Sequence, residues 1–372
     1  MTSLYTWLND SVYTLPLSPG CTQCALGAKM VLLVTGQCSS NCFYCPLSQQ
    51  KKNKDVIYAD EWKLTNETET DVLIKEAESI DAQGAGITGG DPLFVWKRTT
   101  RYIQLLKDAF GEKFHIHLYT AGLQNSDHLG DIINAGLDEL RFHPLPSTWQ
   151  AMEQSPLSSI IQDVLKTGID IAIEIPVIPD KYNEILSLLS WANEQGIHWV
   201  NLNELEFSET NMHALTKKGY TTKDDLSAAV RGSQETAFKV VRNASEEKWH
   251  LGVHYCSVSF KDGIQLRNRI TRRAHHVAYD GDIITDEGTL LRGCIEAGST
   301  SLKNVMTILL QQFKIPQRFM KLDLKKNRVL IAAWHLEDIA EELQRQGYQC
   351  FLIEEYPTAD HLEVERIPLP LK

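Results

Sequence analysis

The sequence lacks the features that place a chain in or across a membrane. None of its 372 residues belong to an uninterrupted apolar run of about eighteen, so no transmembrane helix is expected. The first residues, MTSLYTWLNDSVY, have neither the basic region nor the apolar region of a signal peptide. These absences predict a cytoplasmic protein without a membrane partner.

Positive charge is also in deficit. Lysine and arginine number 37 against 48 acidic residues, a net charge of −11. Such a chain does not bind nucleic acid through its overall charge. A basic segment at 260–276, together with KKNK at 51–54, could still bind phosphate or RNA. The alternative is a solvated helix face. The cations of the longer segment are Lys261, Arg267, Arg269, Arg272 and Arg273.

A fourth cysteine is missing where three others gather. In GQCSSNCFYCPLS, residues 36–48, Cys38, Cys42 and Cys45 lie within eight residues. Disulfides are not expected in a reduced cytoplasm. A cubane iron–sulfur cluster takes four ligands, so three thiolates leave one iron open to a substrate. The alternative is zinc-binding or inert thiols, although zinc normally needs a fourth ligand.

Alternating apolar strands and amphipathic helices predict the fold. Repeated βα units indicate a parallel sheet with helices outside it, here an α/β fold built as a partial (β/α)6 TIM-like barrel. A small α/β appendage follows. The expected domains are an extension at 1–28, the barrel at 29–208, a helical and loop-rich extension at 209–300 and the appendage at 301–372. The predicted barrel strands lie at 29–36, 85–90, 114–120, 137–144, 169–179 and 198–207, with another strand at 250–256.

The cysteine spacing carries a family resemblance. Cys38-x3-Cys42-x2-Cys45, with Tyr44 before the third cysteine, resembles the signature of the radical S-adenosylmethionine enzymes. The resemblance implies that these cysteines hold a catalytic [4Fe–4S] cluster, whose open iron binds S-adenosylmethionine. A ferredoxin or flavodoxin type of electron donor would reduce the cluster. Cleavage of S-adenosylmethionine would then give a 5′-deoxyadenosyl radical that abstracts hydrogen from a substrate.

Further positions match cofactor contacts of that family. TGGDPL, residues 88–93, resembles its glycine-rich turn, with aspartate in place of the usual glutamate. Later strands carry polar residues where strands should be apolar, including Asn201, Glu204 and Glu206, and either asparagines or glutamates could face inward. His143 is a candidate pocket residue, and the alternative is a histidine that is only packed or hydrogen-bonded. The expected cofactor-binding residues are Tyr44, Gly89, Gly90, Asp91, Pro92, Thr120, Glu174 and Asn203.

Four of the remaining cysteines suggest a second metal site. Cys21 and Cys24 form a Cys-x2-Cys pair, and Cys256 and Cys294 are distant single residues. Together they could hold an auxiliary [4Fe–4S] cluster or zinc. The alternative is that they are packing thiols, as expected for Cys350 in its apolar run.

A closer resemblance is to uncharacterised archaeal-type proteins related to pyruvate formate-lyase activating enzymes. It rests on residues 29–48, on GAGITGGDPL and on NLNELEFSETN. Three functions follow as hypotheses. The first is hydrogen abstraction from RNA or protein, and the second is activation of a glycyl-radical enzyme. The third, from another class, is a metal-binding regulatory protein without radical chemistry.

Overall fold

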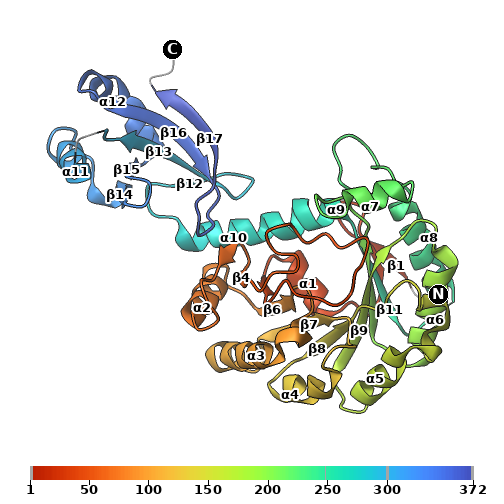
Figure 1. Cartoon of the computed structure of the whole chain (residues 1–372). Coiled ribbons are helices and arrows are strands. Elements are labelled where there is room, and N and C mark those ends of the chain that lie inside the picture. Colours follow the sequence, from red (N-terminus) through yellow and green to blue (C-terminus); the bar gives the residue numbers. More distant parts are fainter. Residues whose placement is uncertain (1–2, 248, 299–300, 370–372) are drawn as a thin grey trace. The chain divides into compact units, whose positions relative to one another are not determined.

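The computed structural model describes residues 3–247, 249–298 and 301–369. The chain forms two compact units, and each is described by itself (Figure 1). The first contains Met1–Glu78 and Ala82–Leu266, and the second contains Ser79–Asp81 and Arg267–Lys372. Within the described ranges, none of the helices has the length and apolar character needed to cross a bilayer.

A parallel sheet is the frame of the first unit. Each strand pairs in parallel with the next, and apolar runs supply its buried residues. The strand at 250–256 joins this sheet beside the sixth, so the described part has one parallel strand more than a (β/α)6 barrel. The parallel strands are β3 (Lys29–Leu33), β6 (Gly84–Thr88), β7 (His115–Thr120), β8 (Glu139–Phe142), β9 (Asp170–Val177), β10 (Trp199–Glu204) and β11 (Gly252–Cys256).

Short antiparallel strands extend both edges of the sheet. β2 (Val12–Thr14) pairs with β11, and β1 (Leu4–Thr6) pairs with β2. At the other edge, β4 (Tyr58–Ala59) pairs with β3, and β5 (Trp62–Lys63) pairs with β4. The strand order therefore runs from β1 to β5 without closing, among the strands that the structure describes.

Helices connect the parallel strands and cover one side of the sheet, as Figure 1 shows. Local signals set several boundaries. Ser155 accepts a hydrogen bond from the amide of Leu157, and Pro156 occupies the first turn of its helix. The covering helices are α2 (Thr70–Ser79), α3 (Trp96–Phe110), α4 (Leu129–Asn134), α5 (Pro156–Leu165), α6 (Tyr182–Glu194) and α8 (Ser233–Glu246).

The two faces of the parallel sheet differ in chemistry. Side chains alternate along a strand, so residues two apart share a face. On β7, Ile116 and Leu118 are fully buried on the helix-covered face. The opposite, inner face is unusually polar. It carries His115, His117, Tyr119, Glu139, Arg141, Glu174, Asn201, Asn203, His254 and Cys256.

Helix α1 (Pro19–Ala25) lies against this inner face. Ser18 caps the helix by accepting from the amide of Gly20, and its hydroxyl also donates to Glu139 at 2.8 Å. A Cβ atom on Gly20 would lie 2.6 Å from both Arg141 Nη2 and His117 Nδ1. The approach of helix to sheet is therefore close enough to require glycine.

The second unit is built on an antiparallel sheet. Its strands are β12 (Ile283–Ile284), β13 (Leu290–Glu296), β14 (Met320–Asp323), β15 (Arg328–Ile331), β16 (Gln349–Glu355) and β17 (Glu363–Leu369). The order is β14-β15-β13-β16-β17, and β12 also pairs with β13. The central strand, β13, lies before residue 301, and the unit starts at Arg267 and not at the expected boundary. Its helices are α10 (Arg267–Val277), α11 (Leu302–Gln311) and α12 (Ala333–Arg345).

A buried ion cluster joins strands of this second sheet. Glu355 is fully buried and accepts hydrogen bonds from Arg292 at 3.0 Å, from Lys326 at 3.0 Å and from Arg328. Arg292 also binds both carboxylate oxygens of Asp282, at 2.6 and 2.7 Å. Each cation therefore has an anionic partner, as burial of charge requires.

Candidate functional site

The three clustered cysteines lie on the loop that follows β3. All three thiols are free and half-buried. Burial raises the pKa of Cys38 and of Cys42, and the charge of Cys45 adds to both shifts. Thiolates gathered on one loop are suited to a positively charged centre, which stabilises them. The loop therefore fits the donor set of a three-cysteine iron–sulfur cluster.

The glycine turn after β6 holds the start of this loop. The amide of Gly90 donates to the carbonyl of Thr35 at 2.8 Å, and the amide of Asp91 donates to the carbonyl of Gln37 at 2.8 Å. Gly89 has a φ of +152°, and a Cβ there would lie 2.1 Å from the Thr35 oxygen. At Gly90 the same atom would lie 2.2 Å from the oxygen of Gln37. These glycines therefore let two distant motifs meet through their backbones.

The carboxylate of Asp91 makes hydrogen bonds to other residues of the chain. It accepts from the hydroxyl of Thr120 at 2.7 Å and from the amides of Leu93 and Ala121 at 3.1 and 3.2 Å. Burial raises the pKa of Asp91, and these three hydrogen bonds oppose the shift. Pro92 begins the short 3-10 helix that Asp91 caps. Asp91 and Thr120, both expected to contact cofactor, therefore contact each other and fix the ends of β6 and β7.

A second anchor of the cysteine loop comes from the segment after β10. The side chain of Asn211 donates to the carbonyl of Tyr44 at 3.1 Å. The hydroxyl of Thr210 lies within reach of two loop carbonyls, at 2.7 Å from Leu47 and 3.2 Å from Cys45. This segment contributes to the family resemblance of the sequence, but no role was predicted for Thr210 or Asn211. Nothing in their local pattern indicates a contact some 165 residues away.

Tyr44 turns its side chain into the protein. Its ring is 6% exposed, and its hydroxyl lies 2.8 Å from Nε2 of His143. Nδ1 of His143 lies 2.7 Å from the carbonyl of Glu174, which can only accept a hydrogen bond. Burial lowers the pKa of His143, so the ring is neutral and Nδ1 carries the proton. The hydroxyl of Tyr44 must then be the donor to Nε2.

Glu174 is the centre of the polar inner face. Its Oε2 accepts from Arg141 at 2.9 Å and from Asn201 at 3.1 Å, and its Oε1 accepts from Asn203 at 2.8 Å. Of the two alternatives for β10, the asparagines therefore take the inner face. Glu204 takes the opposite face, where it accepts from the amide of Val258 at 2.8 Å.

Comparison with known proteins places this geometry in a family. The chain is 41% identical over 364 residues to a protein of Methanocaldococcus jannaschii named "Putative glycyl-radical enzyme activating enzyme MJ0021". The match covers 96% of this chain and 94% of that protein. The chain belongs to this protein's family, within the radical S-adenosylmethionine superfamily. Membership implies a [4Fe–4S] cluster and S-adenosylmethionine, and the cysteine loop fits both.

Other matches are partial. A "Probable GTP 3′,8-cyclase" of Methanopyrus kandleri is 25% identical over 154 residues, covering 41% of this chain and 46% of that protein. A solved structure of Streptococcus suis SuiB bound to S-adenosylmethionine has a TM-score of 0.44 and 9% identity, covering 62% of this chain and 50% of that one. SuiB bound to its precursor peptide SuiA has a TM-score of 0.45 and 12% identity, covering 70% and 53%. Residues 288–369 match a domain of unknown function, DUF8061.

The four cysteines of the predicted second metal site have protein neighbours within their own units. Cys21 donates to Asn201 at 3.3 Å, and burial raises its pKa to about 12. Cys24 is partly exposed, at the end of α1. Cys256 packs against Ala25 and Phe260. In the second unit, Cys294 packs with Leu330 and Ile353. Burial raises the pKa of Cys256, and the charges of Cys21 and Cys24 add to this rise, so these three cysteines lie near one another in the first unit. The second metal site stays a prediction, with packing thiols as its alternative.

Several cationic side chains of the basic segment make contacts within the protein. Lys261 pairs with Glu206 at 3.4 Å. Arg272 binds the carboxylate and the carbonyl of Asp81, both at 2.6 Å. Arg273 is buried and donates to the carbonyl of Pro357 at 2.6 Å. Guanidinium groups held in this way are not available to phosphates, which weakens the case for RNA as the partner.

Proposed function

We propose that the protein is a radical S-adenosylmethionine enzyme that abstracts a hydrogen atom from a protein substrate. One observation carries the first part of this proposal. Cys38, Cys42 and Cys45 form an open three-thiol set on a loop tied to the glycine turn by backbone hydrogen bonds. A structural metal site would need a fourth protein ligand, whereas an open position serves chemistry.

Different residues of the first unit would hold the cluster and S-adenosylmethionine. The three cysteines would bind the cluster. The backbone of the glycine turn and the polar groups of Glu174 and Asn203 would bind and orient S-adenosylmethionine. When bound, the reduced cluster supplies an electron to S-adenosylmethionine, which is the source of the radical. Asp91 and Thr120 act as positioning residues, because both are buried and they hold the turn by bonding to each other.

Reductive cleavage of S-adenosylmethionine tests the chemistry. The anaerobically reconstituted protein, reduced by dithionite or by a ferredoxin or flavodoxin, should release 5′-deoxyadenosine. The Cys38→Ala, Cys42→Ala and Cys45→Ala triple variant should release none. Absence of product from a reconstituted parent with a full cluster would refute the proposal. The metal-binding regulatory alternative would then be favoured.

The name of the 41% identical relative favours protein over RNA as the substrate class. Activation of a glycyl-radical enzyme is the finer form of this proposal. Cell extract from a culture grown on glycine deuterated at Cα provides the test. Deuterium in the released 5′-deoxyadenosine would support abstraction from a glycine of a protein. Deuterium arriving only from labelled RNA would overturn the protein proposal and leave the radical chemistry intact.

A further inference from the structure

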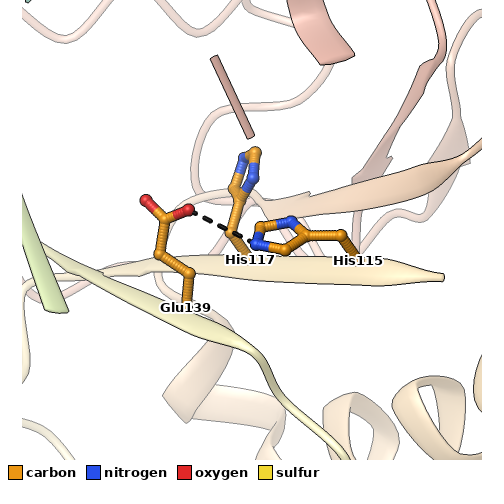
Figure 2. A group of neighbouring side chains, drawn as sticks. All are labelled: His115, His117 and Glu139. Carbon is orange, nitrogen blue, oxygen red and sulfur yellow. Dashed lines mark ion pairs between the residues drawn. The ribbon is translucent and has the colours of Figure 1, made fainter. Parts of the chain in front are cut away.

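Two histidines and a glutamate converge on the inner face of the sheet, at the amino ends of β7 and β8. Figure 2 shows the side chains of His115 and Glu139 pointing toward each other, with the ring of His117 standing beside them. One ligand atom from each lies within 4.8 Å of the other two. Among the described residues, this is the one set of three or more histidine, cysteine or acidic side chains that meets this distance.

Each histidine has one ring nitrogen engaged and one without a partner. Nδ1 of His115 lies 2.6 Å from the amine of Lys29, and Nε2 of His117 lies 2.9 Å from the hydroxyl of Tyr119. The other two nitrogens, Nε2 of His115 and Nδ1 of His117, are buried and make no hydrogen bond. A buried polar atom without a partner is destabilising, so these two neighbouring nitrogens require an explanation.

The carboxylate of Glu139 is held in place by two hydrogen bonds from other residues. Its Oε1 accepts from Nε of Arg141 at 2.7 Å, and its Oε2 accepts from the hydroxyl of Ser18 at 2.8 Å. Oε2 still lies 3.6 Å from Nε2 of His115, too far for a hydrogen bond. Such outer hydrogen bonds are typical of groups that orient a metal ligand.

We propose that His115 Nε2, His117 Nδ1 and Glu139 Oε2 bind a divalent transition-metal ion, zinc or ferrous iron. Metal–ligand bonds of about 2.1 Å place tetrahedral ligands about 3.4 Å apart. His115 and Glu139 already stand at 3.6 Å, and all three ligand atoms lie within 4.8 Å of one another, so binding requires the group to close by at most about 1.4 Å. A bound ion would satisfy both unpartnered nitrogens at once.

The chemistry of the donors selects the class of ion. Two imidazoles and one carboxylate suit zinc or ferrous iron, whereas calcium and magnesium prefer oxygen ligands. The nearby guanidinium of Arg141 already has two carboxylate partners, Glu139 and Glu174.

The position of the group indicates a structural role. It lies at the amino ends of the strands, whereas the cysteine loop follows the carboxyl end of β3. In this kind of sheet, chemistry takes place at the carboxyl ends. Helix α1 closes over the group, since a Cβ on Gly20 would come within 2.6 Å of His117 Nδ1 and 3.2 Å of Glu139 Oε2. A bound ion would therefore fasten β7 to β8 directly beneath α1.

Metal content tests the proposal independently of the radical chemistry. The full-length Cys38/Cys42/Cys45→Ala variant carries no catalytic cluster iron. After anaerobic loading with zinc or ferrous ion and gel filtration, it should retain about one equivalent per chain. Adding His117→Ala or Glu139→Gln should lower retention at least tenfold. His254→Ala removes another buried histidine of the same inner face and should leave it unchanged.

Cobalt gives a readout that does not depend on the folding of those variants. In the triple-cysteine variant, Co²⁺ should give visible bands of a tetrahedral nitrogen–oxygen site without a near-ultraviolet sulfur-to-cobalt band. A sulfur band would instead assign the ion to Cys21, Cys24 or Cys256 and overturn the proposal. Failure to retain zinc, iron or cobalt would overturn it as well, whatever the outcome of the 5′-deoxyadenosine assay.

Discussion

The hydroxyl of Tyr44 donates a hydrogen bond to Nε2 of His143 across 2.8 Å. It thereby connects the cysteine loop to the middle of the sheet, because His143 donates in turn to the carbonyl of Glu174. The Cys42 thiol is a neighbour of the same hydroxyl, and burial raises the pKa of that thiol. The residue before the third cysteine therefore fixes the loop from inside the protein.

Tyr44→Phe should leave Nε2 of the buried His143 without a donor. We expect the free energy of unfolding to fall by about 1–3 kcal/mol, measured by chemical denaturation of the cluster-free protein. Tyr5→Phe, at a ring that is 39% exposed, is the control and should change stability by less than about 0.5 kcal/mol. Equal effects of the two changes would contradict the inferred bond.

Thr120→Val should weaken S-adenosylmethionine binding through Asp91. The change removes the hydroxyl that donates to Asp91 at 2.7 Å while keeping the shape of the side chain. We expect Asp91→Ala to raise the dissociation constant at least tenfold with normal cluster absorbance, and Thr120→Val to reproduce part of that loss. If Asp91 instead bound the cofactor by itself, the valine variant would bind as tightly as the parent.

Cys42→Ala should abolish formation of 5′-deoxyadenosine, because two thiolates cannot hold the open cluster. Product is measured by chromatography after anaerobic reconstitution and reduction. Cys350→Ala, a buried thiol of the second unit, is the matched control and should keep the parent activity after correction for folded protein. Product at the parent rate from Cys42→Ala would remove the catalytic assignment.

Asn211→Ala should reduce cluster retention without removing a ligand. The lost side chain donates to the carbonyl of Tyr44 at 3.1 Å and to that of Glu206 at 3.0 Å, so the cysteine loop would become less ordered. We expect at least twofold less iron per chain after reconstitution and desalting. The neighbouring Met212→Ala, at a side chain that is 55% exposed, should retain the parent iron content.

The second unit should lose stability in acid through Glu355. Burial alone would raise its pKa, but hydrogen bonds from Arg328 and Lys326 lower the pKa below the ordinary 4.5. The stabilisation is therefore complete above pH 4.5 and is lost as the pH falls through the lower pKa of the folded state. Hydrogen exchange of β13 and β15 peptides should accelerate over that range.

Glu355→Gln should remove this pH dependence and destabilise the second unit by about 3–5 kcal/mol, because it leaves buried cations without their shared anion. Glu341→Gln, on the exposed surface of α12, is the control. An unchanged acid profile in Glu355→Gln would show that another carboxylate is responsible.

Several features could be predicted from local sequence alone. The apolar runs predicted the parallel strands β3 to β10 in order, because a buried parallel strand needs consecutive apolar residues. The spacing of Cys38, Cys42 and Cys45 predicted the cluster loop, since ligands from one loop need no long-range information. The turn at Gly89 and Gly90 was found in the same way, although the close approach that requires its glycines was not.

Contacts between distant segments had no such local signal. The strand register of β7 against β8 pairs His117 with Glu139, and neither residue's neighbours in sequence indicate the other. The same holds for Asp91 with Thr120 and for Asn211 with the cysteine loop. The cysteines outside that loop depend on such contacts too, because only the folded chain brings Cys21 and Cys24 near Cys256. The second metal site that they suggested stays a prediction.

The sequence by itself determined the chemistry of the open cysteine loop and the order of the strands that present it. Tertiary structure alone decided which polar residues share the inner face, where the second unit begins, and that two histidines and a glutamate meet beneath α1. The physical reason is that ligand spacing and side-chain periodicity are properties of a few consecutive residues. Partnership across a sheet depends on strand order and register, which only the whole folded chain fixes.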